Sequence, residues 1–346
     1  MSSKIYIPFE NYKGIGGPVT FMQNLKNEWE EAGLKRVSSK AKGKHIFFPI
    51  SYDINHLKRI RDGGGQVIQR LDGIYYPEKH GQKYKKLNQS IKEIYLNYST
   101  HIIFQSEYSK NQCFKMFGEK TNYTIIHNGA PTSYFFPMTK KMNSKVKFIT
   151  TGNFRNLDMI EPVIKAFDEI ASTYEFEFEV VGPVPNPEIL PLLERPYLKY
   201  TKEINDKSVM AKILRSSDAF IYSHLNPPCP NSVIEASACG LPVIGFESGA
   251  MSELCKPNLD LLCHVSEDIF QSYEQFDYLR LKEKIIDFLK NPNPYIENAY
   301  RESSSYSMKE CARKYFEVFE QLTGINLKRN FLDGIKSRFF SVKNVK

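Results

Sequence analysis

Residues 227–244 read PPCPNSVIEASACGLPVI and contain the loop, helix and strand pattern from which the fold of this chain can be inferred. A proline-rich loop precedes a short helical pattern, a glycine ends that pattern, and an apolar run typical of a buried strand follows. Asn231 or Ser232 is expected to cap the helix, and the free N–H groups of its first turn favour an anion such as a diphosphate. Glu235 follows Ser232 by three positions, so its simplest role is the second residue of a capping box.

The same alternation of strands and helices extends along the whole chain. In the carboxyl-terminal half, strands are expected at 147–151, 176–181, 219–223 and 241–246, and helices at 160–172, 206–215, 232–238, 279–289 and 307–322. In the amino-terminal half, strands are expected at 5–7, 45–50, 66–71, 101–105 and 123–126, and helices at 19–32, 55–61, 83–98 and 109–117. This alternation is typical of parallel sheets with helices on both faces.

A lysine-rich stretch without periodicity, residues 137–145, separates the two halves and is interpreted as a linker. We therefore predict an α/β protein of two doubly wound, Rossmann-like domains that face each other across a cleft. The first is expected over 1–137 and the second over 146–325, followed by a tail at 326–346. Ligands of such sheets bind beyond the carboxyl ends of the strands, so the cleft between the domains is the expected site.

Composition excludes several protein classes. Of 346 residues, 41% are hydrophobic, and 24 Phe and 21 Tyr provide ample surface to bury, so disorder is not expected. The sequence shows neither a secretory signal nor an apolar stretch of about 20 residues, which favours a cytoplasmic protein. The six cysteines form no CxxC pair and the histidines no His-Glu-x-x-His motif, so we expect free thiols and predict no metal site.

The net charge of +8 is concentrated at the carboxyl-terminal end. Residues 326–346 carry six basic side chains against Asp333, a net +5, which leaves +3 for the rest of the chain and argues against nucleic-acid binding. Apolar residues recur every four positions in this tail, as in a basic amphipathic helix: Leu327, Phe331, Ile335 and Phe339. The tail is expected either to lie on an anionic membrane, where lipid-linked acceptors reside, or to pack on the first domain.

The stretch from Asn231 to Ile244, followed by ESGAMSEL at 247–254, resembles the retaining glycosyltransferases of family 4, which have the GT-B fold. The resemblance extends weakly over nearly the whole chain. It implies that Glu235 holds the ribose hydroxyls of a donor nucleotide. Asn231 and Ser232, at the helix start, are the other donor-binding candidates of this stretch.

Two further segments match the family. Gly16 and Gly17 precede a helix as in its glycine loop, where a backbone without side chains lets a ligand approach closely; a tight turn explains the pair about equally well. The segment 151–155, TGNFR, matches the place where the family holds an arginine and a lysine against the donor diphosphate. Arg155 is the candidate arginine, and its simpler interpretation is a solvated loop residue.

Two positions depart from the family pattern. A second glutamate usually lies eight residues before the ribose-binding one, near the donor sugar, and Pro227 occupies that position here. Asp158 takes the aligned position of the diphosphate lysine, where a carboxylate pointing inward would repel a diphosphate.

Asp72 ends an expected strand of the first domain and is a candidate for orienting a sugar hydroxyl, unless it only forms an Asp-Gly turn with Gly73. Asn128-Gly129 resembles the turn that closes the family's first domain, and the preceding His127 is interpreted as a packed histidine.

We therefore expect a cytoplasmic, metal-independent retaining glycosyltransferase that moves a sugar from a nucleotide-sugar donor to a glycan or lipid-linked acceptor. No cofactor besides the donor substrate is predicted. Arg155 and the helix starts at Gly17 and Ser232 would stabilise the departing nucleoside diphosphate, with Asp72 as the second catalytic candidate and no protein nucleophile.

Three alternatives stay open. Pro227 and Asp158 leave room for a catalytically inactive GT-B scaffold or nucleotide-sugar-binding subunit. A nucleotide-sugar epimerase would use the same fold without an acceptor.

Overall fold

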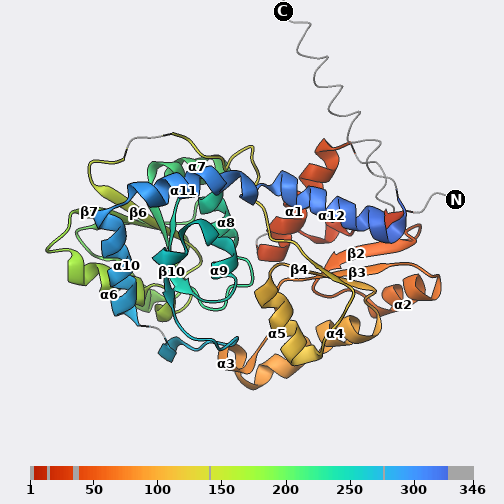
Figure 1. Ribbon diagram of the computed structural model, residues 1–346. Coiled ribbons are helices and arrows are strands. Elements are labelled where there is room, and N and C mark those ends of the chain that lie inside the picture. The colour runs from red at the N-terminus through yellow and green to blue at the C-terminus, as the bar shows by residue number, and fades with distance from the viewer. Residues whose placement is uncertain (1–3, 14–15, 34–38, 140–141, 276, 326–346) are drawn as a thin grey trace, which may run out of the picture. The chain divides into compact units, whose positions relative to one another are not determined.

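The computed structural model describes residues 4–13, 16–33, 39–139, 142–275 and 277–325. The chain forms two compact units, one made of Met1–Asn128 with Met308–Lys346 and the other of Gly129–Ser307. Each unit is built on a parallel sheet with helices packed against it (Figure 1). The prediction of two α/β domains with parallel sheets is confirmed.

The described part of the first unit contains a five-stranded sheet in the order β1-β2-β3-β4-β5. Its strands are β1 (Ile5–Tyr6), β2 (His45–Pro49), β3 (Val67–Leu71), β4 (His101–Phe104) and β5 (Tyr123–Ile125). Its helices are α1 (Gly17–Glu31), α2 (Ile54–Asp62), α3 (Pro77–His80), α4 (Tyr84–Asn97), α5 (Glu107–Phe117) and α12 (Met308–Thr323), with short 3-10 turns at η1 (Phe9–Asn11) and η2 (Gly81–Lys83).

Both faces of the first sheet are buried. All five residues of β2 and of β3 are buried, as expected of parallel strands covered on both sides. Phe47 packs in a cluster with residues of α1 and α12, whereas Phe48 packs with Leu57 of α2 and Ile94 of α4. Alternation along β2 thus sends successive side chains into two separate cores.

Helix α12 belongs to the first unit, whereas the sequence analysis placed it in a second domain ending at residue 325. The rings of Tyr315 and Phe319 lie 5.5 Å and 5.0 Å from the ring of Phe47, measured between centroids. Phe316 meets Trp29 of α1 edge-on at 5.2 Å. This aromatic stripe completes the core above the first sheet, and burial of such rings is the main stabilising term available to the helix.

The described part of the second unit contains a six-stranded sheet in the order β11-β10-β9-β6-β7-β8. Its strands are β6 (Val146–Thr151), β7 (Phe176–Val181), β8 (Leu198–Thr201), β9 (Ala219–Tyr222), β10 (Val243–Glu247) and β11 (Leu262–His264). Its helices are α6 (Glu161–Ile170), α7 (Lys207–Ser216), α8 (Asn231–Ala238), α9 (Met251–Leu254), α10 (Tyr278–Lys290) and α11 (Asn293–Glu302). Shorter 3-10 segments are η3 (Leu157–Met159), η4 (Pro187–Leu193), η5 (Lys256–Leu261), η6 (Tyr273–Gln275) and η7 (Ser303–Tyr306).

The core of the second unit lies between its sheet and the pair α6 and α10, which contact each other (Figure 1). Phe148 of β6 packs against Phe167 of α6 at 5.2 Å and against Phe288 of α10 at 5.8 Å, measured between ring centroids. The second unit begins at Gly129, before the predicted linker at 137–145. Ala130 N–H donates a 2.7 Å hydrogen bond to the carbonyl oxygen of Tyr306, near the end of the same unit.

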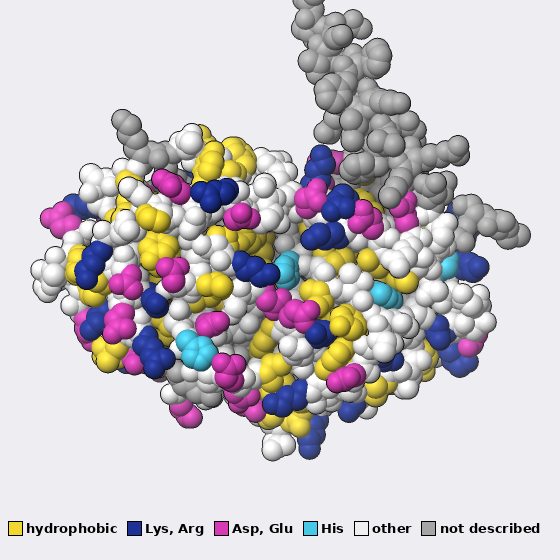
Figure 2. All heavy atoms as spheres, viewed as in Figure 1, with side chains coloured by type: hydrophobic (Ala, Val, Ile, Leu, Met, Phe, Trp, Pro, Cys, Tyr) yellow, Lys and Arg dark blue, Asp and Glu magenta, His cyan; other side chains and the backbone are white. Residues whose placement is uncertain are grey.

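All six cysteines are buried and free, as predicted. Among the described residues, no helix has the length and apolar character needed to cross a bilayer. On the face visible in Figure 2, basic and acidic side chains are interspersed. The tail at 326–346, with its predicted membrane contact, lies outside the described residues.

Candidate functional site

The strand order of the second sheet reverses between β6 and β9, and a ligand site is expected at that point. From β6 the chain continues to β7 and β8 on one side, then returns to β9 and continues to β10 and β11 on the other. Ligands of open α/β sheets bind beyond the carboxyl ends of the strands at such a switch point. The loops after β6 and β9, residues 152–156 and 223–230, therefore bound the candidate site.

These two loops contact each other through His224. A Cβ atom on Gly152 would lie only 3.0 Å from Cε1 of His224, so the loop after β6 approaches the imidazole closely. Ser223 Oγ donates a 2.5 Å hydrogen bond to the carbonyl oxygen of Met159. The ring of Phe154 meets His224 edge-on, with 6.0 Å between centroids. His224 could not be singled out from the sequence, because a lone histidine outside any motif carries no signal.

Helix α8 begins where the loop after β9 ends. Its N-cap residue is Pro230, which makes no side-chain cap hydrogen bond. The expected cap at Asn231 or Ser232, and the capping box with Glu235, are therefore wrong, since Asn231 and Ser232 are the first two helical residues. A proline offers no side-chain oxygen to the N–H groups of the first turn. The partial positive charge of this helix end favours an anion.

Glu235 lies one turn into α8 and is half-buried. Burial raises the pKa of its carboxyl group to about 7, and the positive charge of Lys207 opposes that rise. Lys207 is the first residue of α7, which follows the loop after β8. A carboxyl group with a near-neutral pKa at a ligand-binding edge is typical of a functional site. Lys207 belongs to no motif, so the sequence offers no signal for its proximity to Glu235.

Arg155 lies in the loop after β6 with its side chain exposed, and it forms no ion pair with any residue that the structure describes. Its guanidinium therefore keeps its donors available to an anion at the switch point. Asp158 lies three positions later in η3 and is half-buried.

Pro227 is buried against the loop that follows β10. Gly249 in that loop has a φ of +61°, and a Cβ atom there would lie 2.5 Å from the backbone nitrogen of Pro227. The N–H of Ala250 donates a 2.8 Å hydrogen bond to the carbonyl oxygen of Pro227. The residue at the position of the family's second glutamate thus joins the loops after β9 and β10.

Asp72 follows β3 in the first unit, and its carboxylate pairs with the guanidinium of Arg70. Arg70 is fully buried and also donates hydrogen bonds to Tyr315 Oη at 3.0 Å and to Asn128 Oδ1 at 2.7 Å. Its guanidinium lies 3.7 Å from the ring centroid of Phe21. The carboxylate of Asp72 therefore balances a buried charge.

Gly16 is the N-cap residue of α1, and Gly17 is its first residue. Apart from the chain neighbours, no atom of the described residues lies within 4 Å of a Cβ atom placed on either. Gly16 has a φ of +142°, a conformation that favours glycine. Packing within the first unit thus leaves the space around both residues open.

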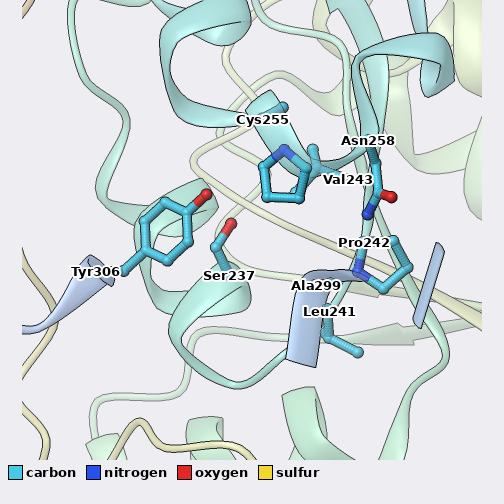
Figure 3. Close-up of a pocket in the computed structure, with 9 residues that line it drawn as sticks. Ser237, Leu241, Pro242, Val243, Cys255, Asn258, Ala299 and Tyr306 are labelled. Carbon is cyan, nitrogen blue, oxygen red and sulfur yellow. The ribbon is translucent and has the colours of Figure 1, made fainter. Parts of the chain in front are cut away.

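Two cavities of the second unit lie away from the switch point. Figure 3 shows a pocket in which the side-chain oxygens of Ser237 and Tyr306 point toward each other. Its volume of about 10 Å³ is the least that one water molecule requires, so it cannot hold a nucleotide. A larger cavity of about 470 Å³ is lined by Arg215, Asp218 and Leu241 at the amino-terminal edge of β9 and β10. No three or more His, Cys, Asp or Glu residues of the described chain come together as a metal site would require.

Comparison with known proteins gives a family match over part of the chain. The family model described as Glycosyl transferases group 1 matches residues 145–276, which include Arg155, α8 and the loop after β10. No curated protein matches the chain.

Solved structures are similar over most of the chain. Sucrose-phosphate synthase from Thermosynechococcus elongatus has a TM-score of 0.65 and 14% identity, over 88% of this chain and 78% of that one. HepE from Anabaena, solved in complex with UDP-glucose, has a TM-score of 0.61 and 13% identity, over 86% and 82% of the two chains. WaaG, a glycosyltransferase involved in lipopolysaccharide biosynthesis, has a TM-score of 0.61 and 13% identity, over 94% and 100%. The chain therefore has the fold of the GT-B glycosyltransferases, and its residues 145–276 match the family model of the Glycosyl transferases group 1.

Proposed function

We propose that this protein transfers a sugar from a nucleotide-sugar donor to a glycan or lipid-linked acceptor, with retention at the anomeric carbon and without a metal ion. The observation that carries the proposal is the position of Glu235. Its carboxyl group lies half-buried, with a pKa of about 7, in the helix that starts at the switch point of the matched domain. The complex of HepE with UDP-glucose, a structure of the same fold, supports a nucleotide sugar as the donor class.

The donor-binding residues have distinct roles in this proposal. Glu235 accepts hydrogen bonds from the ribose hydroxyls of the nucleotide. The first turn of α8, at Asn231 and Ser232, presents its N–H groups and the positive end of the helix to the diphosphate. Arg155, which has no ionic partner among the described residues, binds the same diphosphate through charge-assisted hydrogen bonds.

The first unit contributes Gly16, Gly17 and Asp72 in this proposal. The open space around Gly16 and Gly17 at the start of α1 lets a ligand reach the backbone N–H groups there. Asp72, 13% exposed in its ion pair with Arg70, retains oxygen surface for a sugar hydroxyl.

The reaction needs no protein nucleophile in this scheme. The bond between the anomeric carbon and the leaving phosphate oxygen breaks while the acceptor oxygen bonds to the same face of the carbon. The acceptor proton passes to the leaving phosphate. Arg155 and the α8 amino terminus stabilise the negative charge that develops on the nucleoside diphosphate.

Nucleotide release with a panel of UDP-, GDP- and dTDP-sugars, with and without acceptors, tests the proposal. Acceptor-dependent release by the wild type, lost in Glu235→Ala and kept in the exposed control Glu297→Ala, is the expected result. Activity that persists in EDTA supports the metal-independent scheme, and the anomeric configuration of the product by NMR tests retention. A wild type that neither releases nor binds nucleotide rules the transferase out.

A nucleotide-sugar-binding subunit without transferase activity is the second candidate. Pro227 occupies the position of the family's second glutamate and is buried against Gly249, which favours a binding subunit. It predicts nucleotide binding that Glu235→Ala abolishes, with no release on addition of any acceptor. An epimerase would instead interconvert donor sugars with no acceptor present.

We also propose a cytoplasmic location with peripheral membrane contact through residues 326–346. The net +5 of this segment supports it. Deleting the segment should abolish sedimentation with anionic liposomes, and unchanged partitioning would reject the membrane contact.

A further inference from the structure

The carboxylate of Glu247 connects two residues at the carboxyl edge of the second sheet. Ser252 Oγ donates a 2.9 Å hydrogen bond to Glu247 Oε1, and His264 Nδ1 lies 3.0 Å from Glu247 Oε2. Glu247 is the last residue of β10 and His264 the last of β11, and the two are register partners. Ser252 lies in α9, so one carboxylate joins two strand ends to the helix that follows the loop.

The loop between Glu247 and α9 is also held from its other side. Asn226 N–H donates a 2.8 Å hydrogen bond to Ser248 Oγ, and Ala250 N–H donates one of 2.8 Å to Pro227. Gly249 leaves no space for a side chain against Pro227. Because residues 226–230 lead directly into α8, a shift of this loop displaces the start of the helix that carries Glu235.

We propose that Glu247 is a positioning residue for donor binding, which acts by fixing the loop at 248–250 and, through Pro227, the amino terminus of α8. The proposal rests on the proposed function, since it concerns the affinity for the nucleotide-sugar donor. Glu247 touches no reacting atom in this scheme. It is the first residue of the stretch at 247–254 that resembles the family, and no role was predicted for it from the sequence.

The carboxylate of Glu247 is the hydrogen-bond acceptor for both Ser252 and His264. A carboxylate accepts the Nδ1–H bond from a neutral or a protonated imidazole. The other charged groups near the ring are Glu267, whose Oε1 lies 3.8 Å from Nε2, and Arg280, which donates a 3.1 Å hydrogen bond to the His264 carbonyl oxygen. Asp277 and Arg280 line a small cavity with the imidazole. Glu267 is 96% exposed, so its charge is well screened.

A glutamine at position 247 separates the two contributions of the carboxylate. Its amide keeps the length of the side chain and can still bond to Ser252 and His264, but it carries no charge. Glu247→Gln should therefore retain most of the donor affinity that Glu247→Ala loses.

The experiment measures the donor KM and kcat, with thermal stability alongside. Glu247→Ala should raise the donor KM about fivefold to tenfold with kcat within about twofold, since a partly solvated charged hydrogen bond is lost. Glu247→Gln should raise the donor KM by no more than about twofold. Ser252→Ala should raise it by a smaller factor, and the matched control Glu267→Gln should leave it unchanged.

The outcomes test the positioning role of Glu247 and the proposed transferase function separately. An active wild type with an unchanged donor KM in Glu247→Ala overturns the positioning role and leaves the proposed function intact. A donor KM of Glu247→Gln as high as that of Glu247→Ala also overturns it. A wild type without nucleotide release overturns the proposed function itself. If Glu247→Ala does not fold, Ser252→Ala decides, because it removes only the bond to the loop and keeps the carboxylate beside His264.

Discussion

Arg70 Nε donates a 3.0 Å hydrogen bond to the hydroxyl of Tyr315, and this bond joins β3 to α12 across 245 positions of the chain. Both side chains are fully buried. A buried guanidinium is tolerated only when its donors are paired, and here Asp72, Asn128 and Tyr315 supply the partners. A buried hydrogen bond, in addition to apolar packing, thus attaches α12 to the first sheet.

Tyr315→Phe should lower the free energy of unfolding by about 1–3 kcal/mol, because it leaves a buried charged donor without its partner. Denaturant unfolding monitored by circular dichroism measures the change. Tyr300→Phe removes a hydroxyl from a side chain that is 42% exposed and should alter stability by less than about 0.5 kcal/mol. Equal effects of the two substitutions would contradict a special role for the Arg70 bond.

Gly249→Ala should destabilise the second unit more than Gly64→Ala destabilises the first. Both glycines have positive φ values, +61° and +69°, so both substitutions incur the backbone strain of about 1–2 kcal/mol. Only at Gly249 would the new methyl group lie 2.5 Å from backbone atoms of Pro227, whereas Gly64 faces open space. The additional loss should be about 1–3 kcal/mol. Thermal unfolding of the two variants checks it, and matching melting temperatures would count against the packing of these loops.

Glu235→Gln should stabilise the protein at pH 8 and leave its stability nearly unchanged at pH 5. The pKa of Glu235 is raised from its ordinary value of 4.5 to about 7 by burial, so the folded state binds the proton more tightly than the unfolded chain. Its contribution to stability is present below about pH 4.5 and is lost as pH rises through about 7. A neutral amide escapes that loss, which is on the order of 2 kcal/mol at a half-buried site. Unfolding free energies at both pH values, with Glu297→Gln as the exposed control, test the sign; a gain at pH 5 alone would refute it.

Arg155→Ala should reduce kcat/KM for nucleotide release about a hundredfold, as expected for loss of a group that stabilises developing charge. Arg155→Lys keeps the charge but loses the planar pair of donors, so it should fall between wild type and alanine. Steady-state rates with the best donor of the panel provide the measurement. Lys212→Ala, at an exposed position, serves as control. Wild-type rates in Arg155→Ala would show that Arg155 is only a solvated loop residue without a role in the reaction.

The regular part of the fold was predictable because its strands and helices have strong apolar periodicity. The strand expected at 176–181 is found as β7 with the same bounds, and the helix expected at 83–98 is α4, Tyr84–Asn97. In contrast, β8 reads Leu-Lys-Tyr-Thr and β11 has three residues, too short for a periodic signal. Helix α11 was missed because Pro and Asn surround its start and its buried face contains little beyond Ala299.

The site was predictable only where residues are close in sequence. Asn231, Ser232 and Glu235 share one short helix, so their proximity follows from the pattern. Their predicted capping roles are wrong, because Asn231 and Ser232 are the first two residues of the helix and Pro230 is its N-cap. Lys207 and Glu247 reach the carboxyl edge from two other segments, and only the strand order brings those segments close to α8. The partner of Asp72, Arg70, lies two positions away, yet its burial depends on α12 from the far end of the chain.

The place of α12 in the first unit has a consequence for synthesis on the ribosome. Phe47 and Trp29 are made early, but the aromatic rings that cover them, Tyr315, Phe316 and Phe319, are translated only after the whole of Gly129–Ser307. The second unit is continuous in sequence and can close its own core first. Until α12 emerges, the face of the amino-terminal sheet that contains Phe47 has only part of its apolar cover. This chain therefore most needs protection from aggregation while its first unit still lacks α12.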